Sequence, residues 1–150
     1  MTYPVLLDFP APILAVYSRE SVVAEKFQAM VMLGIANSRM KDFFDLWMLC
    51  RQFEFQGPTL SQAIRATFDR RRTPVPAEVP LALSADFSRD PGKQTQWRAF
   101  VGKGKLDTGG AALDEIVDVM RGFLMPPAKA VATGGVLEMV WPAVGPWQPL

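Results

Sequence analysis

Hydrophobic residues recur at helical spacing through two consecutive segments, 18–34 and 40–53, and this pattern predicts two adjacent amphipathic helices. Ser18 is a suitable N-cap for the first helix, and Asn37-Ser38 forms a short polar joint before the second. On a helical wheel, the apolar arc of the first helix consists of Val22, Val23, Phe27, Ala29, Met30, Leu33 and Gly34. Lys26 lies in the middle of this arc, where a charge is costly unless an anionic group meets it.

The second helix combines a broad apolar face with a narrow polar stripe. The apolar face contains Met40, Phe43, Phe44, Leu46, Trp47 and Cys50. The stripe contains Lys41, Asp45 and Gln52, and the four-residue spacing of Lys41 and Asp45 predicts an ordinary surface ion pair. Asp42 lies outside the stripe, beside Leu46, Leu49 and Phe53, and is therefore the more informative of the two aspartates.

The remaining pattern predicts three further helices and several short extended segments. The first of these helices is expected to start at a capping box, Thr59–Gln62, and to end at Arg70–Arg72. The second is expected to start at Asp90-Pro91 and to be stopped by Gly102 and Gly104. The third is expected from Ala111 to Leu124 and to be ended by Pro126-Pro127. Extended segments are expected at Val5–Phe9, Ile13–Tyr17, Thr73–Pro80, Leu81–Ser84 and in the tail 128–150, whose Trp141 and Trp147 pack back on the helices. We expect one α+β, mainly helical domain spanning 1–150, with about five helices and short N-terminal and C-terminal strands.

Composition narrows the chemistry that the chain can perform. The 150 residues carry a net charge of +1, so any contact with nucleic acid or membrane must come from a local patch. The absence of histidine and the single cysteine, Cys50, exclude Cys/His zinc sites, Ser-His-Asp or Cys-His catalysis and an internal disulfide. The sequence has neither a signal peptide nor a membrane-spanning apolar run, so we expect a cytoplasmic location.

Each candidate residue has an ordinary structural interpretation beside a functional one. Lys26 could bind a phosphate or carboxylate at the edge of a cleft, or cover apolar surface with its stem while its head reaches water. Asp42 could be a functional carboxylate or an early-helix acid stabilised by the helix dipole. Arg39 could bind an anion or a helix end. The basic run Arg70–Arg72, with Arg65, could contact a nucleic acid backbone or form a solvated helix end.

Two strings in these helices carry a family resemblance. They are A-E-K-F-Q-A-M at 24–30 and N-S-R-M-K-D-F-F-D-L-W at 37–47. They resemble the A-E-K-x-x-A and R-x-K-D-x-x-D-L helices of the AbiEii/AbiGii nucleotidyltransferase toxin family. The lead-in L-L-D-F-P-A-P and the G-P-W near the end are also similar to bacterial members. The resemblance implies a polymerase-β-like fold in which these segments form the C-terminal helical part.

The resemblance also implies an activity and roles for particular residues. Family members are typically toxins of toxin–antitoxin or abortive-infection systems, and some of them transfer a nucleotide from an NTP to RNA, with tRNA as acceptor. The resemblance therefore implies Mg²⁺, NTP and a cognate antitoxin. Lys26 matches the lysine that holds the NTP phosphates, and Asp42, followed closely by Asp45, matches the acid that activates the acceptor. Arg39 and Lys41 flank the same nucleotide-binding site. In-line transfer to a hydroxyl needs positioning and charge neutralisation, so the missing histidines are no obstacle.

The sequence departs from the family at its metal-binding motif. The family carries a G-[ST] turn followed by a D-x-D pair of carboxylates, and this sequence contains neither. Asp8 comes after the point where those metal-binding strands should end, so the sequence predicts no metal ligands. We therefore expect the chain to be the truncated, C-terminal portion of such an enzyme and to lack nucleotidyl transfer alone.

Two other interpretations stay open beside the partial enzyme. One is a non-catalytic helical interaction module that binds an antitoxin, RNA or a full-length partner, and the other is a decayed reading frame. If a missing sheet normally covers the first helices, apolar surface around Val23, Phe27 and Met30 should be exposed. Self-association through that surface would follow.

Overall fold

The computed structural model describes residues 18–34 and 39–150, which form six α-helices and a small antiparallel sheet. The N-terminal strands expected at Val5–Phe9 and Ile13–Tyr17, the joint Asn37-Ser38 and Asp8 lie outside the described residues. The mainly helical α+β class is confirmed for the described part. The bounds of the elements are α2 Arg19–Leu33, α3 Met40–Gln52, β1 Phe55–Gln56, α4 Gly57–Arg70, η2 Leu81–Leu83, α5 Ala85–Ser88, α6 Pro91–Gly104, α7 Leu113–Ala132, β2 Met139–Trp141 and β3 Gln148–Pro149.

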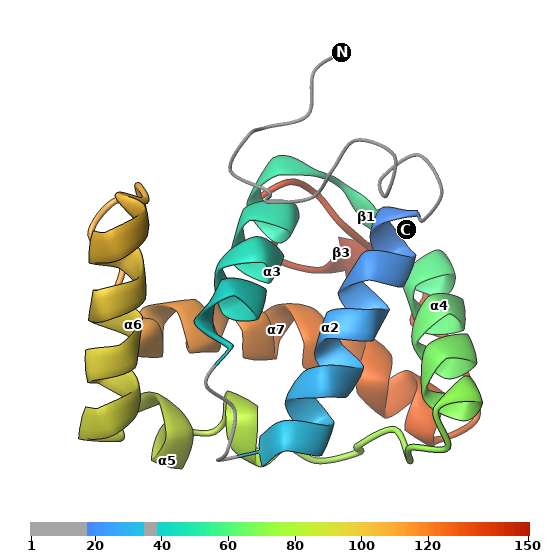
Figure 1. Ribbon diagram of the computed structural model, residues 1–150. Helices are drawn as coiled ribbons and strands as arrows, with labels where there is room; N and C mark the ends of the chain where they lie inside the picture. Colours follow the sequence, from blue (N-terminus) through green and yellow to red (C-terminus); the bar gives the residue numbers. More distant parts are fainter. Residues whose placement is uncertain (1–17, 35–38) are drawn as a thin grey trace.

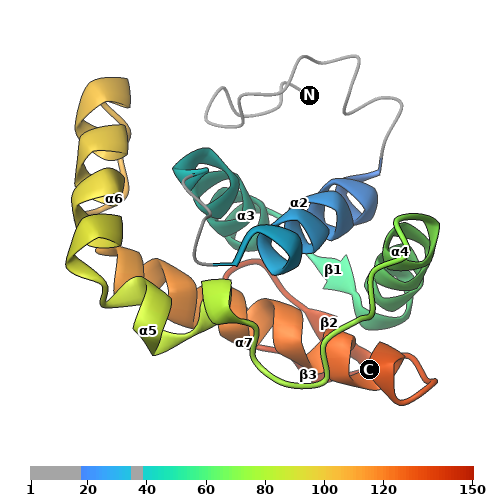
Figure 2. The same cartoon turned by 60° about the horizontal axis from the view of Figure 1, so that its bottom comes forward.

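The long helix α7 forms the base on which the other helices pack (Figure 1). Helices α3 and α4 both contact α7, while α2 packs mainly against α4 and also touches α3. Helix α6 stands at one side, next to α3 and one end of α7, as the tilted view in Figure 2 also shows. The first two predicted helices are therefore neighbours in space, and α6 lies beside the start of the second.

The centre of the apolar arc of α2 is buried within the chain itself, whereas Leu33 at its end is 38% exposed. Val23, Phe27 and Met30 are all fully buried, and the Phe27 ring lies 5.3 Å from the ring of Phe68 on α4. The expectation that this arc would be exposed is therefore wrong, because α4 covers the face that we assigned to a missing sheet. Self-association through this arc has no structural support.

The ends of α2 and α6 follow the capping residues in the sequence. Ser18 accepts a hydrogen bond from the amide of Ser21, and Asp90 accepts one from the amide of Lys93. Gly34 ends α2 with a positive φ of 53°, which a glycine adopts without strain. Gly104 is the last residue of α6, so the expected stop is confirmed there, whereas Gly102 lies inside the last turn.

The helix expected from Thr59 begins two residues earlier than its predicted cap. Gly57 is the first residue of α4, and a Cβ there would lie 2.3 Å from the carbonyl oxygen of Leu137. A glycine is therefore required where β1 passes directly into α4 against the segment before β2. Ser61 donates to the Gly57 carbonyl and accepts from the Leu137 amide, which fixes this junction in place of the capping box.

The prediction of an extended segment at Leu81–Ser84 is also wrong. Leu81–Leu83 form the 3-10 helix η2, and Ser84 caps the short helix α5. Leu83 and Phe87 are fully buried, and Phe87 stacks on Phe43 of α3 at 5.4 Å. A short apolar run does not distinguish strand from helix by its period, and here burial against α3 favours the helical turns.

Helix α7 continues through Pro126-Pro127 to Ala132, so the predicted stop at these prolines is wrong. A proline at position 127 has no N–H for the carbonyl of Phe123, one helical turn earlier. The indole N–H of Trp147 donates to that same carbonyl oxygen at 2.9 Å. A residue from the tail therefore supplies the hydrogen bond that the helix lacks.

The tail forms an antiparallel hairpin and packs on the helices through aromatic rings. β2 pairs antiparallel with both β1 and β3. The Phe123 ring lies 4.8 Å from Trp141 and is stacked with Trp147 at 6.0 Å. Trp141 also donates its indole N–H to the carbonyl of Cys50 on α3. The predicted packing of both tryptophans is confirmed, although the extended tail begins after Ala132 and not at residue 128.

Candidate functional site

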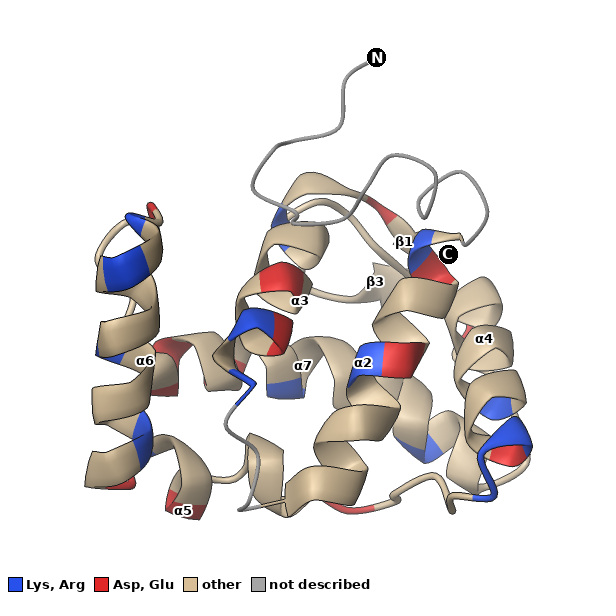
Figure 3. Cartoon of the chain, in the orientation of Figure 1, with Lys and Arg blue, Asp and Glu red and all other residues tan. Residues whose placement is uncertain are grey.

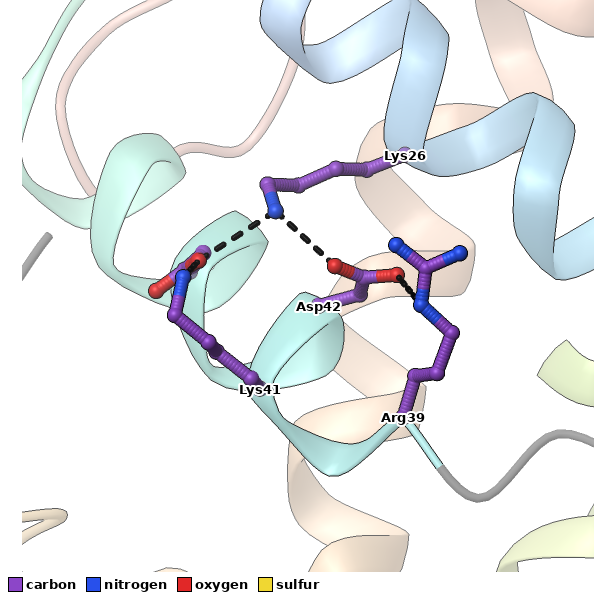
Figure 4. Close-up of polar contacts among 5 residues, drawn as sticks. Lys26, Arg39, Lys41 and Asp42 are labelled. Carbon is purple, nitrogen blue, oxygen red and sulfur yellow. Dashed lines mark hydrogen bonds and ion pairs between the residues drawn. The ribbon is translucent and has the colours of Figure 1, made fainter. Parts of the chain in front are cut away.

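Lys26 projects from the otherwise apolar face of α2 toward the start of α3 (Figure 4). The residues one turn away on either side, Val23 and Met30, are fully buried, and the Lys26 side chain is only 11% exposed. A buried ammonium needs anionic partners to offset its lost hydration. Those partners come from the first two turns of α3.

The start of α3 supplies two carboxylates to the same ammonium group. Lys26 Nζ lies 2.8 Å from Asp42 Oδ1, with hydrogen-bond geometry, and 3.2 Å from Asp45 Oδ2. Asp42 lies in the first turn of α3, where its amide donates to the carbonyl of Arg39 and its charge is favoured by the helix dipole. The structure therefore joins Lys26 to both aspartates that the sequence singled out.

Two further cations complete the cluster around these aspartates. Arg39 Nε lies 3.1 Å from Asp42 Oδ2, and Lys41 Nζ lies 2.6 Å from Asp45 Oδ2. The Lys41–Asp45 pair was expected from the sequence, but its placement on an exposed stripe was wrong, because the Asp45 side chain is completely buried. Three cationic side chains therefore surround two carboxylates in this cluster. Figure 3 shows the corresponding blue and red segments side by side at the start of α3.

A pocket of about 590 Å³ opens beside this charge cluster. One side is lined by Lys26, Arg39, Met40, Lys41 and Asp42, and the other by Gln96, Ala99 and Phe100 of α6. The sequence indicated the charged residues of the first group, but it singled out neither Gln96 nor Phe100. Their four-residue spacing places both on one face of α6, yet nothing in the sequence places α6 beside α3.

The described residues do not fit a Mg²⁺ site. Within residues 18–34 and 39–150, no group of three or more aspartate, glutamate, cysteine or histidine side chains is arranged to hold a metal ion. Asp42 lines the pocket and Asp45 lies buried behind it, and both carboxylates contact lysine or arginine. A divalent cation would bind these carboxylates only by displacing the lysine and arginine side chains that contact them.

Some of the basic residues at the end of α4 form contacts within the chain. Arg70 and Arg71 both pair with Glu25 on α2, and Arg71 Nη2 lies 2.6 Å from the Glu25 carboxylate. Arg65 donates to the carbonyl of Gly135. These contacts fasten α4 to α2 and to the turn after α7, which favours the structural interpretation of this run over nucleic acid contact.

Cys50 is the remaining side chain with nucleophilic potential. It is fully buried on α3, and burial raises the pKa of its thiol to about 12, an effect that the nearby charge of Arg51 opposes. Its Sγ contacts the Trp47 carbonyl at 3.3 Å. A neutral, enclosed thiol is a poor nucleophile, so Cys50 has a packing role.

Comparison with known proteins identifies a family for most of the chain. A family model described as "Nucleotidyl transferase AbiEii toxin, Type IV TA system" matches residues 1–119 of the 150 residues. No curated protein and no solved structure matches the chain. None of the helices in the described part has the length and apolar character needed to cross a bilayer.

Proposed function

Because the chain belongs to the nucleotidyl transferase AbiEii toxin family of type IV toxin–antitoxin systems, we propose that its pocket binds the phosphates of an NTP for transfer of a nucleotide to RNA. The observation that carries the proposal is the 2.8 Å contact between Lys26 Nζ and Asp42 Oδ1 at the wall of the pocket. We further propose tRNA as the acceptor and an antitoxin as the counterpart of this toxin.

Lys26 is the proposed phosphate-binding residue. Its ammonium group lines the pocket while its stem is held among buried residues of α2, so its position is well defined. Arg39 and Lys41 line the same pocket with side chains that are 57% and 38% exposed, and both can turn toward an anion. Three cationic side chains at one pocket favour an anionic ligand over a neutral one.

Asp42 is the proposed proton acceptor for the incoming hydroxyl. It lines the pocket, and its Oδ1 is held by Lys26. When phosphate oxygens attract the ammonium group, Asp42 Oδ1 can instead accept a hydrogen bond from the acceptor hydroxyl. In the transfer, the acceptor oxygen forms a bond to the α-phosphorus, the bond to pyrophosphate breaks, and the hydroxyl proton passes to Asp42.

Asp45 has a different proposed part in this site. Its side chain is completely buried, and its Oδ2 contacts both Lys26 and Lys41. It therefore acts as a positioning residue that holds Lys26 of α2 and Lys41 of α3 in place. A substrate would meet the lysines and Asp42 without touching Asp45 itself.

Members of this family generally use a divalent metal ion with the NTP, and the described residues offer no ligands for it. The sequence also lacks the G-[ST] turn and the D-x-D pair. We therefore propose that this chain binds the nucleotide but does not complete the transfer by itself.

Equilibrium binding of the four NTPs to the purified chain tests the proposal. We expect the unsubstituted chain to bind NTP and Lys26→Gln to bind at least about tenfold more weakly, the loss of one charged phosphate contact. Lys103→Gln is the matched control, because Lys103 lies near the end of α6 and does not line the pocket. Equal NTP affinity in Lys26→Gln and the unsubstituted chain, with both folded, would contradict the proposal.

A further inference from the structure

The two walls of the pocket differ in chemistry. The wall from α2 and α3 carries Lys26, Arg39, Lys41 and Asp42, whereas the wall from α6 carries an amide, a methyl group and an aromatic ring. Gln96, Ala99 and Phe100 are spaced by three and four residues, so they share one face of α6. The pocket is therefore charged on one side and uncharged on the other.

The ring of Phe100 is supported from two directions. Its centroid lies 6.1 Å from Phe44 on α3, in an edge-to-face arrangement, and 5.9 Å from Trp97 on the same helix. Phe100 is half-buried by these neighbours and still lines the pocket. An aromatic side chain held in this way offers a rigid surface on which a flat ring can stack.

Gln96 adds directional polar groups beside that ring. Its side chain is exposed, lines the pocket and hydrogen-bonds to no other residue in the described part of the chain. A glutamine amide carries two donor hydrogens and an acceptor oxygen, which can pair with the edge of a nucleobase. Ala99 between them is small, so the wall leaves room for a ring.

We propose that Gln96, Ala99 and Phe100 form the subsite for the nucleobase of the NTP, with Phe100 stacking on the base and Gln96 selecting it. This inference rests on the proposed function, because the cations on the facing wall are taken to hold the phosphates. The division of the pocket into a cationic and an aromatic side matches the division of a nucleotide into phosphates and base. Its volume of about 590 Å³ lies within the range of small-ligand sites.

Parallel binding measurements with NTPs and inorganic tripolyphosphate separate the two subsites. We expect Phe100→Leu to weaken NTP binding about tenfold, as for loss of one stacked base, without changing the affinity for tripolyphosphate. We expect Gln96→Ala to change the order of affinity among the four NTPs, again with tripolyphosphate unaffected. Gln62→Ala, an exposed glutamine on α4, is the matched control.

The outcomes distinguish failure of this inference from failure of the proposed function. If the unsubstituted chain binds neither NTP nor tripolyphosphate, the proposed function itself fails. If it binds both equally well, the phosphate site stands and the base subsite is wrong. The inference would also be overturned if Gln96→Ala and Phe100→Leu left the NTP affinities and their order unchanged. If the two variants lost only tRNA binding, the α6 wall would be assigned to the acceptor and the inference would again be wrong. Because Gln96 is exposed, its variant remains informative if Phe100→Leu fails to fold.

Discussion

Lys26 Nζ lies 2.8 Å from Asp42 Oδ1, and this contact joins helix α2 to the first turn of helix α3. Both side chains are largely buried, at 11% and 5% exposure. In such a pair, removing one partner leaves a charge with little solvent to stabilise it. The contact is therefore a structural link between the helices as well as the centre of the proposed site.

A double-mutant cycle on Lys26→Met and Asp42→Asn should detect this link. We expect a coupling free energy of about 1–3 kcal/mol from urea unfolding, because the two groups are in direct contact and poorly screened. The control cycle uses Arg121→Gln and Asp118→Asn, a pair in which Asp118 is 70% exposed. That surface pair should couple by less than about 1 kcal/mol. Similar coupling in both cycles would contradict the assigned burial of the first pair.

Asp45→Asn should destabilise the chain more than any exposed aspartate substitution. The Asp45 carboxylate is fully buried and contacts Lys26 and Lys41, so its neutralisation leaves two cations with one fewer anionic partner. We expect a loss of about 3 kcal/mol in the free energy of unfolding. Asp118→Asn is the matched control and should lose less than about 0.5 kcal/mol. Equal stability of the two variants in urea would show that Asp45 has no structural role.

Trp147→Phe should loosen the second half of α7. The substitution keeps an aromatic ring beside Phe123 but removes the N–H that satisfies the Phe123 carbonyl. We expect a loss of about 1–3 kcal/mol, the cost of an unpaired buried acceptor. In a Pro127→Ala background the helix regains its own donor, so the same substitution should cost less. An equal cost in both backgrounds would contradict this account of α7.

Cys50 should resist thiol reagents in the folded chain. Burial raises its pKa from 9.0 to about 12, so at pH 8 the native thiolate fraction is about a thousandfold below that of the unfolded chain. A disulfide reagent such as Ellman's should label the chain rapidly in urea and very slowly without it. Rapid labelling of the native chain would overturn the assignment.

The raised pKa of the Cys50 thiol also predicts how the stability of the chain changes at high pH. A raised pKa in the folded state means that the neutral thiol is favoured by folding, so this contribution is fully present below pH 9. It is lost as the pH rises from about 9 to about 12, where the unfolded thiol ionises and the folded one does not. Cys50→Ala should lack this part of the pH dependence.

The purified chain should not label tRNA when it is incubated with Mg²⁺ and labelled NTPs. The physical reason is that the sequence lacks the D-x-D carboxylates on which in-line transfer with two metal ions depends. The measurement compares tRNA labelling by the unsubstituted chain and by Lys26→Gln. Labelling that exceeds the Lys26→Gln background would contradict the proposal that the chain does not act alone.

Local sequence signals predicted the elements that depend on neighbouring residues. Ser18 and Asp90 cap the expected helices, Gly34 ends α2, and the period of apolar residues placed Phe27, Met30 and Phe43 on apolar faces that are buried in the structure. The same period made Lys26 stand out as a charge on an apolar face. These features were predictable because capping and periodicity act within one or two helical turns.

The tertiary structure decided which faces meet, and the sequence could not. On the helical wheel of α3, Asp45 belongs to a polar stripe, yet in the structure Lys26 from α2 contacts and covers this aspartate. Pro127 would end α7, but Trp147, twenty residues later, supplies the missing donor. The α6 wall of the pocket depends likewise on packing between distant segments. The sequence by itself determined the first two helices, the unusual lysine and the family resemblance. Burial, the charge cluster and the pocket were decided by contacts between helices, because a helical period marks an apolar face without naming its partner.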